Sequence, residues 1–289
     1  MVHPLVAQIL YNRGVVDVAD VQAFLAGTFE HDNPFRMKGV DRAVALVRQM
    51  VKQGETIVIY GDYDVDGVTA SAILAQVIRA MGGQAITYIP NREDEGYGLN
   101  PDAITELAGQ GVRLMITVDC GIRSLEEVAL ARRLGMHVIL TDHHHIGAAL
   151  PHADAVINPR QADCPYPFKD LAGVGVAYKL AQALVRSNLR VPLPTTRDEI
   201  QEEDLLDLVA LGTVADMVPL LEENHALVIE GLKGINTGHR PGLAALMDVS
   251  DVRPGQVSTD TIGFVLAPPL NAAGRISEAT IALELLMAE

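Results

Sequence analysis

The sequence predicts an α/β fold with a mostly parallel sheet flanked by helices. Short runs rich in β-branched residues alternate with helical patterns between residues 56 and 159. Several of these runs end in polar residues, and helical patterns dominate before residue 53 and after residue 170. Strands that alternate with helices of this length form right-handed βαβ units. We therefore expect a parallel sheet between an N-terminal helical extension and a mostly helical C-terminal part.

Five strands and three helices make up the expected α/β unit. The strands are predicted at 56–62, 84–90, 112–121, 136–144 and 153–159. The helices between them are predicted at 68–83, 100–111 and 124–135. Short polar side chains accept hydrogen bonds from the first amides of a helix. We therefore expect Asn100 or Asp102 near the N-cap of the second helix and Ser124 as the N-cap of the third.

Helical patterns flank this unit on both sides. They lie at 19–27, 39–54, 173–187, 202–218 and 223–236, with a loop at 188–201 and two helices expected around 267–275. The predicted organisation is an N-terminal helical extension at 1–52, an α/β metal-binding domain at 53–220 and a helical segment at 221–289. The chain ends in an apolar helical pattern without a stop signal, which indicates that a longer protein continues beyond it.

Composition indicates a globular chain of the cytoplasm. Of the 289 residues, 49% are apolar, and the two cysteines do not suggest a disulfide framework. No apolar run reaches the length of a membrane span, and the N-terminus lacks the features of a signal peptide. The net charge of −15 disfavours a simple electrostatic nucleic-acid binder. It is compatible with a nucleic-acid enzyme, because bound cations offset the charge of a carboxylate metal site.

The segment GDYDVDG, residues 61–67, first suggests a calcium-binding EF-hand loop. Such a loop needs a bidentate glutamate at its twelfth position, and the twelfth residue counted from Asp62 is Ile73. An EF-hand loop also follows a helix, whereas this segment follows a predicted strand. The sequence therefore argues against a calcium loop.

Polar side chains follow three of the predicted strands, and the carboxyl ends of parallel strands share one edge of the sheet. A single aspartate at a strand end is more often a helix cap or a turn residue, but three such strand ends favour a site. The residues expected to converge are Asp62, Asp64, Asp66, Asp119, Asp142, His143 and His144.

Carboxylates mixed with imidazoles suit Mn²⁺ better than Ca²⁺ or a structural zinc site. The number of carboxylates is sufficient for two ions, which is the usual arrangement for the hydrolysis of phosphate esters. The sequence contains neither a P-loop nor the nucleophile elbow of serine hydrolases. Cys120 is interpreted as a small buried residue, because no other cysteine or histidine stands at zinc-finger spacing.

Five segments, in this order, resemble the DHH phosphoesterase superfamily: GDYDVDGVTA, ITVDCG, TDHHHIG, GTVADMVPL and LNAAGRI. Within the superfamily they are most similar to the RecJ branch of single-strand-specific 5′→3′ exonucleases. The resemblance runs along the whole chain and includes the segment at 90–100. Each motif alone is weak, but the ordered set is specific.

The resemblance implies roles for the aspartates. In the wider family the first motif begins with a ligating histidine, and Asp62 occupies that position here, as it does in the RecJ branch. Asp62 is expected among the metal ligands, although the departure leaves its role open. Asp64 would bind the first metal ion and Asp66 the second, and Asp119 would bridge the two ions.

The remaining site residues follow from the same resemblance. His143 and Asp216 would ligate the second ion, while Asp142 would orient the histidines and His144 would contact the scissile phosphate. Without the resemblance, Asp216 would be interpreted as a helix-end residue, since it lies near the end of a helical pattern that Pro219 stops.

Two arginines complete the expected site. Arg92 resembles a residue that grips phosphate, here the 5′-terminal one, and Arg275 resembles one that contacts substrate near the metal ions. An arginine suits phosphate because its fork binds two oxygens at once, although an exposed arginine is often only part of a weak surface ion pair. Gly173 and Gly175 open a helix whose free amides could also meet a phosphate, unless close helix packing explains them.

The resemblance implies a Mn²⁺- or Mg²⁺-dependent 5′→3′ exonuclease of DNA repair and recombination, with two ions and single-stranded DNA as substrate. Its partners would be single-strand-binding protein and a helicase. The DHHA1 and OB-fold domains of the branch are expected beyond residue 289. Two alternatives stay open. The first is a phosphodiesterase for short RNA, 3′-phosphoadenosine phosphate or cyclic dinucleotides, and the second is a non-catalytic interaction module.

Overall fold

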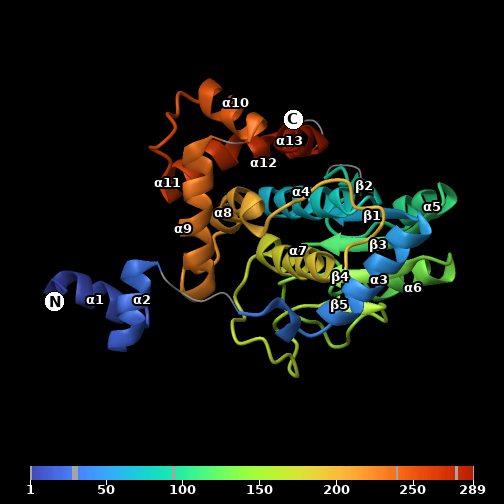
Figure 1. The fold of residues 1–289 in the computed structure, drawn as a ribbon, viewed down its shortest axis with the longest axis horizontal. Helices are drawn as coiled ribbons and strands as arrows, with labels where there is room; N and C mark the ends of the chain where they lie inside the picture. Colours follow the sequence, from blue (N-terminus) through green and yellow to red (C-terminus); the bar gives the residue numbers. More distant parts are fainter. Residues whose placement is uncertain (1, 28–31, 93–94, 239, 277–278, 289) are drawn as a thin grey trace.

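The computed structural model describes residues 2–27, 32–92, 95–238, 240–276 and 279–288. Residues 93 and 94 of the expected phosphate-binding segment lie outside this part. At the centre is a sheet of five parallel strands in the order β2-β1-β3-β4-β5 (Figure 1). The strands are β1 Thr56–Gly61, β2 Gln84–Tyr88, β3 Val112–Val118, β4 His137–Thr141 and β5 Ala155–Ile157. The predicted parallel sheet flanked by helices is confirmed.

Strand β1 is buried on both faces of the sheet, as is usual for parallel sheets. Its residues Ile57, Val58, Ile59 and Tyr60 are all fully buried, and a strand covered on both faces is apolar at every position. Because successive side chains point to opposite faces, Ile57 and Ile59 join the larger hydrophobic core, while Val58 and Tyr60 join a smaller one.

Helices cover both faces of the sheet (Figure 1). On the larger core lie α3 Val40–Gln53, α4 Val65–Ala80 and α7 Gly173–Arg190. On the smaller core lie α5 Pro101–Gly109 and α6 Leu125–Arg133. Helix α8, Leu206–Ala215, packs against α4, α7 and α9, and its first eight residues are all buried. The α/β unit thereby continues into the helical part of the chain.

The helical part of the chain continues with α9, Glu222–Thr237. Helices α1 Pro4–Asn12 and α2 Val18–Ala26 lie apart from the sheet, and Phe24 of α2 stacks on His225 of α9 (Figure 1). The other elements are the short helices η1 Pro34–Arg36 and η2 Glu202–Leu205, then α10 Pro241–Val249, α11 Thr259–Thr261, the π-helical η3 Ile262–Leu266, α12 Ala267–Ile276 and α13 Thr280–Leu286. No helix in the described residues is long and apolar enough to cross a bilayer.

The start of one helix differs from its prediction, while two predicted N-cap residues are confirmed. Helix α4 begins at Val65 instead of residue 68, because the Asp64 side chain caps it by accepting from the Gly67 amide. Ser124 is the N-cap residue of α6, as predicted, and its carbonyl accepts from the Val128 amide, although its side chain makes no capping bond. The expected cap of α5 is confirmed, since the Asn100 side chain accepts from the amides of Asp102 and Ala103.

The segment 267–275 is itself helical, so the prediction of two helices around it was wrong. It continues the run of α11 and η3 without a break. A proline inside a helix removes a backbone hydrogen bond and crowds the carbonyl four residues before it. Pro268 and Pro269 follow the π-helical turn directly, where the regular hydrogen-bond pattern is already interrupted.

Candidate metal centre

The carboxyl ends of β1, β3 and β4 lie side by side in the sheet, and each is followed by residues of the expected site. Asp62 follows β1, Asp119 follows β3, and Asp142 and His143 follow β4. The parallel register places these ends on one edge, which explains why residues far apart in the chain can meet.

The side chains converge closely. His143 Nε2 lies 3.1 Å from Asp119 Oδ1, 3.8 Å from Asp216 Oδ2 and 4.0 Å from Asp66 Oδ2. His144 Nδ1 lies 3.8 Å from Asp119 Oδ1. Three groups have ligand atoms within 4.8 Å of one another and could each hold an ion: Asp62, Asp64 and Asp119; Asp66, His143 and Asp216; and Asp119, His143 and His144.

The loop that carries the first three aspartates doubles back on itself. Asp64 is the N-cap of α4, a role that aspartates at strand ends often have, and it also belongs to one of the three candidate ligand groups. A Cβ on Gly67 would lie 2.5–2.8 Å from the backbone of Asp62. Only glycine permits this close approach, which places Asp62 beside the first turn of the helix.

Asp66 is held by the N-terminus of α7. Its carboxylate oxygens accept hydrogen bonds from the amides of Gly173 and Val174, each at 2.7 Å. The suggestion that these amides bind a phosphate is therefore wrong, because a buried carboxylate of the same chain occupies them. A Cβ on Gly173 would also lie 2.6–2.7 Å from the side chain of Asp119, so glycine lets the two elements meet.

Asp119 has an unusual backbone conformation. Its φ is 60°, in the left-handed region, and its amide donates to the carbonyl of Thr141 at the end of β4. Aspartate and asparagine adopt this conformation more readily than most residues. The turn directs the carboxylate toward His143 and leaves Cys120 buried, as expected for a small interior residue.

Asp142 orients His144 and not His143. Its Oδ1 accepts from His144 Nδ1 at 2.8 Å and from the His144 amide at 2.9 Å, and its Oδ2 accepts from the Ile122 amide at 2.9 Å. The hydrogen bond to Asp142 raises the pKa of His144. Burial, followed by repulsion from His144, lowers the pKa of His143 to about 4. The His143 imidazole thus stays neutral, as a metal ligand must be, while the raised pKa of His144 favours its charged form.

The carboxylates repel one another in the absence of a cation. Burial and then the charge of Asp64 raise the pKa of Asp62 to about 7 and that of Asp216 to about 6. Burial raises the pKa values of Asp66 and Asp119 well above the ordinary range, and neighbouring aspartates raise them further. Perturbed acids of this kind cluster at functional sites.

Four buried atoms in the described part of the site have no hydrogen-bond partner: Asp62 Oδ1, Asp119 Oδ1, His143 Nε2 and Asp216 Oδ2. His143 Nε2 and Asp119 Oδ1 lie 3.1 Å apart but are not aligned as donor and acceptor. Buried polar atoms are ordinarily satisfied. Since all four atoms are good ligands, the residues fit one or two divalent cations with mixed oxygen and nitrogen coordination, such as Mn²⁺.

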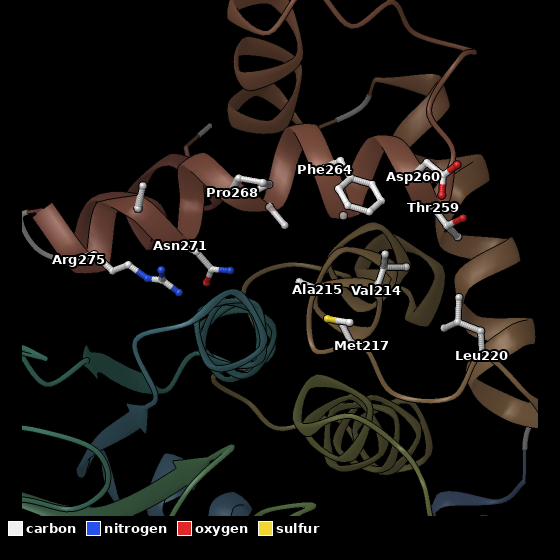
Figure 2. A pocket seen from close by; sticks show the side chains of 13 residues that line it. Val214, Ala215, Met217, Leu220, Thr259, Asp260, Phe264, Pro268, Asn271 and Arg275 are labelled. Carbon is white, nitrogen blue, oxygen red and sulfur yellow. The ribbon is translucent and has the colours of Figure 1, made fainter.

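The expected arginines flank the aspartate loop. The Arg92 guanidinium lies over the Tyr63 ring, with Cζ 5.0 Å from the ring centroid. Arg275 is exposed on α12 and lines a cavity of about 590 Å³ together with Met217, Phe264 and Asn271 (Figure 2). Tyr63 and Asn271 are not among the predicted site residues, although both lie inside motifs that carry the family resemblance.

The fold and the site define a class of protein. The family model described as "DHH family, N-terminal domain" matches residues 56–213, and the chain belongs to this family. The match covers the sheet, α4, α7 and most of α8, and therefore all the strand-end ligands. The predicted resemblance to DHH phosphoesterases is confirmed.

Comparison with individual relatives narrows the family to one branch. The chain is 43% identical to "Single-stranded-DNA-specific exonuclease RecJ" of Bacillus subtilis, an alignment that covers 99% of this chain and 35% of the relative. Its identity to the protein of the same name from Escherichia coli is 38%, over 99% of this chain and 50% of the relative. The chain thus spans between a third and a half of the length of these relatives.

Solved structures agree. "Crystal structure of exonuclease RecJ bound to manganese" superposes with a TM-score of 0.76 at 36% identity, covering 87% of this chain and 61% of that one. A crystal structure of RecJ from Thermus thermophilus in complex with Mn²⁺ gives a TM-score of 0.77 at 32% identity, covering 97% of this chain and 38% of that one.

Proposed function

We propose that the chain is the catalytic part of a metal-dependent exonuclease that releases nucleotides from the 5′ end of single-stranded DNA. The observation that carries the proposal is the convergence of four unpartnered, buried ligand atoms at the carboxyl edge of the sheet. The single-strand-specific exonucleases to which the chain is similar, and the manganese in two of their structures, support the substrate and the metal.

The proposed metal ligands form two sets, which both lie at the carboxyl edge of the sheet. Asp62, Asp64 and Asp119 would hold one ion, and Asp66, His143 and Asp216 the other, with Asp119 between them. Bound divalent ions would lower the pKa of a water molecule and offset the charge of the phosphate. The remaining groups would bind and orient substrate.

His144 is proposed to contact the scissile phosphate. Its hydrogen bond to Asp142 fixes the ring and raises its pKa, which favours the cationic form that an anionic phosphate attracts. Arg92 and Arg275 both lie near Tyr63 of the aspartate loop, where Arg92 would bind the 5′-terminal phosphate and Arg275 would contact the substrate near the metal ions. We further propose that the protein acts in the cytoplasm with a helicase, which separates the strands, and with single-strand-binding protein, which holds them.

The test is the release of nucleotides from 5′-labelled single-stranded DNA in the presence of Mn²⁺, using Asp119→Asn. Asparagine has the same shape and tolerates the left-handed backbone at this position, whereas alanine would add strain. We expect activity to fall at least about 10²-fold, because a shared metal ligand is lost. Asp251→Asn is the matched control, since Asp251 is exposed, has φ of 55° and is outside the site.

Assays with other substrates distinguish the proposed exonuclease from other DHH phosphoesterases. Activity on dinucleotide RNA or cyclic dinucleotides but not on single-stranded DNA would assign the site to another DHH phosphoesterase. Equal activity of Asp119→Asn and the unmutated chain would contradict the proposed site.

A further inference from the structure

The aspartate loop at residues 62–66 is held in place by a helix from the far end of the chain. Asn271 of α12 accepts a hydrogen bond from the Val65 amide at 3.1 Å. Figure 2 shows Asn271 and Arg275 on the side of α12 that faces α4. The contact joins residues 206 positions apart.

The hydrogen bond satisfies a donor that the helix itself cannot satisfy. Val65 is the first residue of α4 and is 1% exposed, so its amide has no partner within the helix and little access to water. The Asp64 side chain caps the Gly67 amide and leaves that of Val65 free. Asn271 therefore supplies the missing half of the cap, between two residues proposed as ligands, Asp64 and Asp66.

A second contact from the same helix supports the first. A Cβ on Gly274 would lie 2.9 Å from the carbonyl oxygen of Tyr63 and 3.6 Å from its Cβ. Gly274 is buried within α12, where glycine is otherwise unfavourable. Its absent side chain lets the helix backbone lie directly against the loop.

We propose that Asn271 and Gly274 position the aspartate loop for metal binding, so that α12 sets the geometry of the metal ligands without touching a metal ion. This inference rests on the proposed function and adds two residues to its machinery. Arg275 follows Gly274 directly, and Tyr63 of the same loop lies beneath the Arg92 guanidinium. The contacts of α12 thus place Arg275 beside the loop that carries Asp62, Asp64 and Asp66.

The experiment measures Mn²⁺ affinity by calorimetry, together with KM and kcat on single-stranded DNA. Asn271→Leu keeps the size of the side chain and removes the acceptor. Gly274→Ala inserts a methyl group against Tyr63. We expect Mn²⁺ affinity to fall about 10–100-fold in each, as for other residues that orient metal ligands. Asn271→Asp keeps an oxygen acceptor, and its added charge does not oppose a cation, so it should retain most of the affinity.

Matched controls separate positioning from general stability. Asn236 of α9 also accepts from a backbone amide, that of Val257 at 2.8 Å, but lies on another element. Gly263 lies in the same helical run, and a Cβ there would contact only Val214, at 3.9 Å. Asn236→Leu should lower the melting temperature, Gly263→Ala should leave it unchanged or raise it, and neither should change Mn²⁺ affinity.

The outcomes are distinct. Unchanged Mn²⁺ affinity in both Asn271→Leu and Gly274→Ala overturns this inference while the proposed function stands. Absence of Mn²⁺ binding in the unmutated chain and in both controls overturns the proposed function and the inference with it. A loss in Asn271→Leu that Asn271→Asp restores supports the inference, because thermal stability alone would not follow the acceptor atom.

Discussion

At the scale of single residues, the metal-free site is destabilised by its own charges. Asp62 is 5% exposed, and burial together with Asp64 raises its pKa to about 7, far above the ordinary value of 3.8. An acid whose pKa is raised by folding lowers the free energy of unfolding at any pH above that pKa. The penalty is relieved as the pH falls through about 7 toward 3.8. Buried aspartates of this kind destabilise the metal-free fold and are suited to bind a cation.

We predict from this charge repulsion how Asp62→Asn behaves in the presence of a chelator. At a pH of about 8 the variant should be more stable than the unmutated chain by on the order of 1–3 kcal/mol, since it removes a buried charge. The difference should shrink as the pH is lowered to about 5, where the native aspartate is protonated. The pKa of His143 is lowered in both proteins, so its effect on stability cancels in the comparison. Thermal unfolding at several pH values measures the effect.

Asp154→Asn provides a control of opposite sign. Burial alone would raise the pKa of Asp154, but hydrogen bonds from the Val138 amide and His137 outweigh it, so the pKa is lowered. Its charge therefore stabilises the fold above the unfolded pKa. The variant should be less stable than the unmutated chain at a pH of about 8. A stabilised Asp154→Asn or a destabilised Asp62→Asn would contradict the account.

At the scale of elements, α7 and α9 are joined by a buried ion pair. Lys179 of α7 is fully buried and pairs with Glu223 of α9, which also accepts from the hydroxyl of Tyr166. Burial lowers the pKa of Lys179, while Glu223 opposes this shift. Because the N-terminus of α7 holds Asp66, this pair supports the element that positions a proposed metal ligand.

We predict that Lys179→Met destabilises the protein by about 3–5 kcal/mol, because it removes the cation that balances the buried Glu223 carboxylate. Adding Glu223→Gln should recover part of this loss. The matched control is Lys38→Met, since Lys38 and Asp163 form an ion pair whose side chains are 42% and 71% exposed. That change should cost far less than Lys179→Met, because water screens an exposed pair. Urea unfolding of the four proteins tests the prediction, and equal losses in both lysine variants would refute it.

At the scale of the whole molecule, the two N-terminal helices contribute little to the core. Within the described part of the chain, α1 buries only Leu10, and α2 buries no residue. They meet the rest of the described chain through the stacked Phe24 and His225 and through Gly27, which lies against Ile229. Helix α3 differs, because it buries six residues against the larger core.

Removal of residues 1–31 should therefore leave a folded chain that binds Mn²⁺ with unchanged affinity. Removal of residues 1–54 should abolish cooperative unfolding, because the core would lose the apolar face of α3. Circular dichroism during heating and Mn²⁺ calorimetry distinguish the two truncations. Loss of metal binding in the shorter deletion would show that α1 and α2 support the site.

Much of the fold was predictable because its signals are local. The runs from 56 to 159 specify their own strands through β-branching, and their glycines and caps mark where helices begin and end. The expectation of two helices around 267–275 was wrong at Pro268 and Pro269, because the π-helical turn that accommodates these prolines within a continuous helix is not encoded in a simple apolar period. Ser124 stands at the predicted N-cap position of α6, but residue type alone did not determine whether its side chain would make a capping bond.

The sequence by itself indicated most of the residues that could hold a metal ion, since polar residues after parallel strands share one edge of the sheet, whereas Asp216 followed only from the family resemblance. The tertiary structure decided which of them point at one another: His143 toward Asp119, Asp66 into the amides of α7, and Asp142 toward His144. It alone revealed Asn271, whose partner lies 206 residues away. The physical reason is that strand edges follow from local periodicity, whereas the direction of a buried side chain is set by packing between distant elements.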